Sequence, residues 1–129
     1  MKNTATRSNT SNILKKSTVI TLTGLRKISL NDWYSQKSHW SKRKQIKDLY
    51  FWVIKSQFKH VFPKDGKYIV SYEFFYRVRP LDASNTIAQV KLVEDIIFED
   101  DRWDIIEKIE ISSRKADKDY IRIVVTELI

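Results

Sequence analysis

Alternating apolar and polar positions predict the β-strands of this chain. In residues 67–79, KYIVSYEFFYRVR, every even position from Tyr68 to Val78 is apolar or aromatic, which is typical of a strand with one buried face. Pro80 ends this strand. A β-branched run closed by Gly24 predicts a shorter strand over residues 18–23.

Two more strands are expected later in the chain. Trp103, Ile105, Ile109 and Ile111 alternate in the first, and DYIRIVVTEL, residues 119–128, forms the second. The eight-residue polar segment SSRKADKD separates them, so we predict that these two strands pair antiparallel.

Apolar positions at helical spacing predict two helices. The first covers about residues 41–60, and its apolar stripe consists of Ile46, Leu49, Tyr50 and Val53. The second covers about residues 85–97, with Ser84 as its N-cap and with Ile87, Val90, Val93 and Ile97 as its apolar positions. The order β-α-β-α-β-β predicts an α/β (α+β) fold, in which two helices pack on a mixed four-stranded sheet.

Length and composition are those of one small folded domain. The chain has 129 residues, of which 42% are hydrophobic. Residues 1–17, rich in Ser, Thr, Asn and Lys, are expected to be a flexible basic arm, and residues 18–129 the domain. No cysteine, apolar leader or membrane-length apolar run occurs, which favours a cytoplasmic protein without a membrane contact. With only two glycines there is no phosphate-binding loop, so no nucleotide cofactor is expected.

Charge is distributed unevenly along the chain. The net charge is +8, yet residues 1–80 hold 17 Lys and Arg against 4 Asp and Glu, while residues 81–129 hold 7 against 12. A basic surface attracts polyanions, and nucleic acid is the commonest one inside cells. Solvated lysine faces without a nucleic-acid partner are the alternative interpretation of the same composition.

Carboxylates gather in the acidic half. Asp82 follows the long strand, Asp95 lies in the second predicted helix, and Asp100 and Asp101 lie in the loop that leaves it. Carboxylates from several elements can hold Mg²⁺, with Mn²⁺ as an alternative, and such ions stabilise a phosphodiester displacement. We therefore expect Asp82 and Asp101 to approach closely enough to share a divalent ion. The remaining acids of this region are expected to be solvated: Glu94, Glu99 and Asp104.

The segments ISLNDWYSQKSHWSKRKQIKDLY and LDASN…K…ED…DD, together with the order of elements, resemble the RusA-type Holliday-junction resolvases, a family common in phages. The resemblance covers about residues 18–128. It implies a homodimeric, Mg²⁺-dependent endonuclease that cuts branched DNA, in the host cytoplasm if phage-encoded. It also implies a metal site, onto which Asp82 and Asp101 are carried over, with Asp100 beside Asp101. We add Asp95 as a further ligand, and Lys91 or Lys37 as the cation beside the site.

Aromatic and cationic residues alternate before and along the first predicted helix. Such a mixture can stack on bases splayed at a junction while cations follow the backbone, although a hydrophobic staple on the helix would look similar. For His39, a structural or merely exposed role is the favoured interpretation. The residues expected to contact DNA are Asn31, Lys37, His39, Trp40, Lys42, Arg43, Lys44, Lys47, Arg79 and Asn85.

Two positions depart from the family pattern. Pro80 stands where the family has the first acid of a pair, and Thr86 stands where it has a lysine. A second hypothesis is therefore a junction-binding or DNA-binding protein of the same fold with weakened or lost catalysis. A third is a structural or regulatory protein whose basic face docks on an acidic partner.

Overall fold

The computed structural model describes residues 16–35 and 40–128. Most of the predicted arm lies outside these ranges, while its last two residues, Lys16 and Ser17, belong to the first strand. Two of the expected DNA contacts, Lys37 and His39, also lie outside the described residues.

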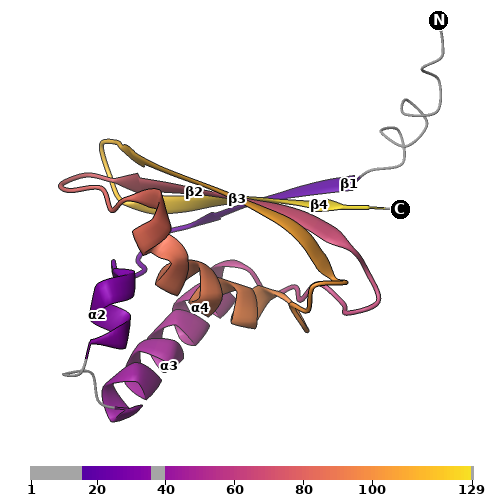
Figure 1. The fold of residues 1–129 in the computed structure, drawn as a ribbon, viewed down its shortest axis with the longest axis horizontal. Coiled ribbons are helices and arrows are strands. Elements are labelled where there is room, and N and C mark those ends of the chain that lie inside the picture. Colours follow the sequence, from indigo (N-terminus) through magenta and orange to yellow (C-terminus); the bar gives the residue numbers. More distant parts are fainter. Residues whose placement is uncertain (1–15, 36–39, 129) are drawn as a thin grey trace, which may run out of the picture.

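Four strands form one mixed sheet, and the helices lie on one side of it (Figure 1). The strands are β1 (Lys16–Leu22), β2 (Tyr68–Tyr76), β3 (Ile106–Lys115) and β4 (Tyr120–Glu127), in the spatial order β1-β4-β2-β3. Strand β4 is antiparallel to both β1 and β2, whereas β2 and β3 are parallel. The predicted α+β fold with a mixed four-stranded sheet is confirmed.

The predicted antiparallel pairing of the last two strands is wrong, because β2 lies between β3 and β4. The 3-10 helix η1 (Ala83–Thr86) and helix α4 (Ile87–Ile97) connect β2 to β3. This crossover returns the chain to the same end of the sheet, so β3 adds parallel to β2. Strand β3 also continues through Lys115, and half of the polar segment expected to be a connection is therefore strand.

Helix α3 (Trp40–Gln57) packs on the rest of the molecule through Ile46, Tyr50 and Ile54, one helical turn apart. Ile46 and Tyr50 of the predicted stripe are buried, whereas Leu49 is exposed and Val53 is half-buried; Ile54, which was not predicted, completes the buried stripe. A short helix that the pattern did not predict, α2 (Leu30–Tyr34), precedes α3. Its N-cap is Ser29, whose side chain accepts a hydrogen bond from the backbone N–H of Asp32 at 3.0 Å.

Helix α4 lies between the sheet and α3 (Figure 1) and is therefore buried on most of its sides. Its buried residues are Ala88, Gln89, Val90, Leu92, Val93, Glu94 and Ile97. The predicted N-cap is wrong: Ser84 lies inside η1, and Asp82 occupies the N-cap position of η1.

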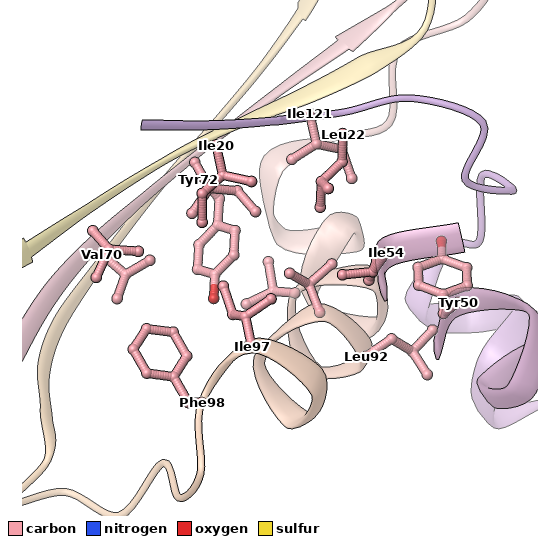
Figure 2. Close-up of a cluster of buried hydrophobic side chains, with 14 of the residues drawn as sticks. Ile20, Leu22, Tyr50, Ile54, Val70, Tyr72, Leu92, Ile97, Phe98 and Ile121 are labelled. Carbon is pink, nitrogen blue, oxygen red and sulfur yellow. The ribbon is translucent and has the colours of Figure 1, made fainter. Parts of the chain in front are cut away.

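The even positions of β2, from Tyr68 to Tyr76, are all buried, as the alternation predicted. Val78 is 67% exposed because the strand has already ended, and Trp103 is exposed in the turn before β3. Figure 2 shows Tyr72 beneath the sheet with its hydroxyl oxygen directed toward α4. In the described part of the chain, no helix has both the length and the apolar character needed to cross a membrane.

Candidate functional site

The C-terminal end of α4 brings three carboxyl groups and a lysine together. We call Glu94, Asp95, Asp101 and Lys91 the acidic cluster. Lys91 Nζ lies 2.6 Å from Asp101 Oδ2 and 3.9 Å from Glu94 Oε1. Two of the predicted site acids, Asp95 and Asp101, and the predicted cation Lys91 therefore do lie in one place.

Backbone hydrogen bonds hold the end of α4 and the loop that follows it. The N–H of Phe62 donates to the carbonyl of Ile97 at 2.8 Å, and the N–H of Glu99 donates to the carbonyl of Phe62 at 2.9 Å. The loop then leads back along the helix, so that Asp101 reaches Lys91.

Glu94 is the buried member of the acidic cluster. Its side chain is only 3% exposed, and its Oε2 accepts a hydrogen bond from Tyr72 OH at 3.2 Å. Burial raises the pKa of Glu94 to about 7, and a hydrogen bond with Asp101 raises it further, while Lys91 opposes the shift. The expectation that Glu94 is solvated is therefore wrong.

The spacing of apolar residues in the sequence contained a signal for this burial. Position 94 falls one turn after Val90 and one turn before Ile97, on the stripe that faces the sheet. The partner of Glu94, Tyr72, lies on the buried face of β2, where a phenol needs an acceptor.

The pKa values of Asp101 and Asp95 are shifted in opposite directions. The hydrogen bond from Lys91 lowers the pKa of Asp101 and raises the pKa of Lys91. Burial raises the pKa of Asp95, with a further contribution from Asp101, and the charges of Lys91 and Lys47 oppose it. Because the charge of Lys47 on α3 acts on Asp95, the acidic cluster lies beside helix α3.

Asp82 is not part of this cluster. It precedes η1, whereas Asp101 follows α4 and reaches back to Lys91. Asp100 makes other contacts: its side chain accepts a hydrogen bond from the N–H of Asp101 and pairs with Arg102 at 3.5 Å. Within residues 16–35 and 40–128, no group of three or more His, Cys, Asp or Glu is placed to hold a metal ion. That Asp82 and Asp101 share a divalent ion stays a prediction, as does dependence on Mg²⁺.

A second charged feature lies between α3 and the segment that leaves β1. A pocket of about 300 Å³ is lined there by Arg26, Lys27, Asp32, Trp33, Lys42 and Arg43, with buried Ile28 and Ile46. We call it the cationic pocket. Lys42 and Arg43 were predicted DNA contacts, whereas Arg26 and Lys27 were missed, although two adjacent cations follow the first predicted strand in the sequence.

Arg43 is fixed by aromatic neighbours. Its guanidinium carbon lies 5.6 Å from the ring centre of Trp33 and 5.8 Å from that of Tyr34, both within cation–π range. Among the residues described, its Nε is a buried donor without a hydrogen-bond partner. Such a donor gains from an acceptor brought by a ligand.

A buried polar chain holds the Arg26 side of the pocket against α3. Tyr50 OH donates to the carbonyl of Arg26, and Gln89 Nε2 donates to Tyr50 OH at 3.0 Å. Gln89 Oε1 in turn accepts from Tyr76 OH at 3.0 Å. Gly24, at a φ of +79° that glycine adopts without strain, turns the chain from β1 into this segment.

The remaining predicted DNA contacts are spread over the surface. Asn31, Trp40 and Lys47 are exposed on α2 and α3. Lys44 pairs with Asp48 one turn along α3, at 2.9 Å.

Two of these predicted contacts lie near Asp82, on the connection between β2 and α4. Arg79 is exposed, and its carbonyl accepts from Lys27 Nζ at 2.7 Å. Asn85 lies in η1, where its N–H donates to the carbonyl of Asp82.

No family model, curated protein or solved structure matches this chain.

Proposed function

We propose that this chain is a DNA-binding protein and that the cationic pocket, together with the exposed cations of α3, forms its contact surface. The observation that supports this proposal is the grouping of Arg26, Lys42 and Arg43 around one hollow. In the described part of the chain, no ion pair joins any of these three to a carboxylate. Cations beside aromatic rings suit a strand of nucleic acid, whose phosphates and bases need both.

The proposed ligand class is branched DNA. The test is a binding titration with a synthetic four-way junction, a linear duplex of the same sequence and a single strand, at several salt concentrations. The logarithm of the affinity should fall linearly with the logarithm of salt concentration, because each phosphate contact releases counterions. A preference for the junction supports the proposal, and equal, salt-indifferent binding to all three contradicts it.

A second candidate function is endonuclease activity on branched DNA. It is favoured by one observation: Asp101 and Asp95 lie with Lys91 at the end of α4 and beside Lys47 of the cationic helix α3. The fit to a metal ion is incomplete, since Lys91 neutralises Asp101 and Glu94 retains its proton up to about pH 7. The predicted homodimer belongs to this candidate, and a molar mass from light scattering tests it.

Cleavage is tested on the same junction with Mg²⁺ or Mn²⁺ added. Symmetric nicks that disappear in Asp101→Asn, with junction binding kept, would support the nuclease and place its centre in the acidic cluster. Asp82→Asn is the matched variant: loss of nicking in Asp82→Asn alone would move the centre to the start of η1. The absence of nicks in both metals would leave the DNA-binding function alone.

A further inference from the structure

We infer that the cationic pocket takes one unpaired nucleotide of a DNA strand, with its phosphate held by Arg26, Lys42 and Arg43 and its base against Trp33. This inference rests on the proposed function and deepens it, because it states which part of a branched DNA the protein recognises.

The size of the pocket favours a single nucleotide. Its volume of about 300 Å³ lies at the lower end of the range of about 300–1,000 Å³ that is usual for small-ligand sites. A duplex keeps its bases stacked inside and offers only its backbone to a concave site. An unpaired nucleotide, such as one at a branch point, can turn its base out of the stack and enter.

The chemistry of the lining matches both halves of a nucleotide. The guanidinium of Arg43 lines the pocket, and a phosphate oxygen is among the strongest acceptors for it. Trp33 offers an aromatic surface in the same pocket.

The fluorescence of Trp33 reports directly on whether a base binds in the cationic pocket. The chain has four tryptophans, and three of them, Trp40, Trp52 and Trp103, are exposed. Replacing these three by Phe leaves Trp33 as the single reporter in the full-length protein. The probes are hexathymidylate and an abasic strand with the same number of phosphates. We expect a saturable change in Trp33 emission with hexathymidylate, and at least about tenfold weaker binding of the abasic strand, which cannot stack.

A second experiment uses Arg43→Lys, which keeps the positive charge but removes the planar guanidinium and its Nε donor. We expect about tenfold weaker binding of hexathymidylate, whereas the control Lys108→Arg, on β3 and outside the pocket, should change binding by less than about twofold. Equal binding of the abasic strand, or saturation without a change at Trp33, would overturn the inference. If junction binding persists in that case, the proposed function stands; if no DNA binds at all, both fail.

Discussion

The acidic cluster at α4 and the cationic pocket beside α3 differ in how their charges are compensated. In the acidic cluster the charges are satisfied internally, since Lys91 pairs with Asp101 and Glu94 shares its hydrogen bonds with Tyr72 and Asp101. In the cationic pocket, among the residues described, Arg26, Lys42 and Arg43 have no carboxylate in ion-pair range.

This difference favours the cationic pocket over the acidic cluster as the region proposed to bind a ligand. A buried carboxyl that can keep its proton, beside a neutralised ion pair, is stable without a metal ion. Neighbouring cations repel one another, and that repulsion is relieved when a polyanion binds. The pocket is therefore the stronger candidate for recognition, and the cluster is the stronger candidate for holding the end of α4 in place.

The largest expected effect follows from reversing charge in the pocket. The double variant Arg26→Glu with Lys42→Glu should weaken junction binding by about a thousandfold at low salt and lower the salt slope by about two. Both side chains are exposed, so the fold should be unaffected. Fluorescence anisotropy over a series of salt concentrations measures both quantities.

The control for this double variant is Lys64→Glu with Lys108→Glu, which makes the same change of net charge outside the pocket. It should weaken binding far less. Equal losses in the two double variants would mean that only overall charge matters, and the pocket would have no special role.

The next largest effect is expected at Glu94, the buried acid of the acidic cluster. In the folded state Glu94 keeps its proton up to about pH 7, whereas in the unfolded chain it loses the proton near 4.5, so stability falls as pH rises through this window. Glu94→Gln keeps an acceptor for Tyr72 and a donor toward Asp101, and it cannot ionise. We expect the variant to be more stable than the parent at pH 8.5, by up to about 3 kcal/mol, and to differ little at pH 4.5.

Urea unfolding at the two pH values measures this difference. Glu110→Gln on β3 is the matched control, since it makes the same substitution at an exposed carboxylate. A parent protein whose stability does not fall between pH 4.5 and pH 8.5 would show that Glu94 is ionised throughout.

The periodic part of the fold could be predicted from the sequence, but the strand order could not. Alternation in residues 68–76 placed β2 correctly, because side-chain direction in a strand is a local property. The pairing of β3 with β2 depends on the crossover through α4, and a short polar connection between β3 and β4 pointed the other way. A helix between two strands is the better indicator of parallel neighbours.

The candidate site, too, could be predicted only in part from the sequence. Lys42 and Arg43 could be identified from their charge and from the aromatic residues around them. Lys91 was predicted as a cation beside the carboxylates, but its direct pairing with Asp101 could not be foreseen, because it depends on how the loop after α4 turns back. The contact of Glu94 with Tyr72 joins two elements and likewise required the packing of α4 on the sheet.

A smaller effect is expected where the pocket is attached to the core. Tyr50→Phe removes the hydroxyl that donates to the Arg26 carbonyl and accepts from Gln89. Leaving these buried groups without a partner should cost about 1–3 kcal/mol in unfolding free energy. It should also loosen the Arg26 side of the pocket, so DNA affinity should fall in parallel with stability. The control Tyr120→Phe alters a partly buried tyrosine of β4 that stacks on Phe75, and unchanged DNA binding in both variants would contradict the link between Tyr50 and the pocket.

The smallest effect concerns an ion pair on the cationic helix itself. Lys44 and Asp48 lie one turn apart on α3, with 65% and 57% of their side chains exposed, so Asp48→Asn should change stability by no more than about 0.5 kcal/mol. The same variant releases Lys44 from its partner and removes a negative charge beside the proposed DNA path. We therefore expect junction binding to strengthen by about twofold to fivefold at low salt and to return to the parent value at high salt. Weaker binding in Asp48→Asn would show that DNA does not approach α3 along this side.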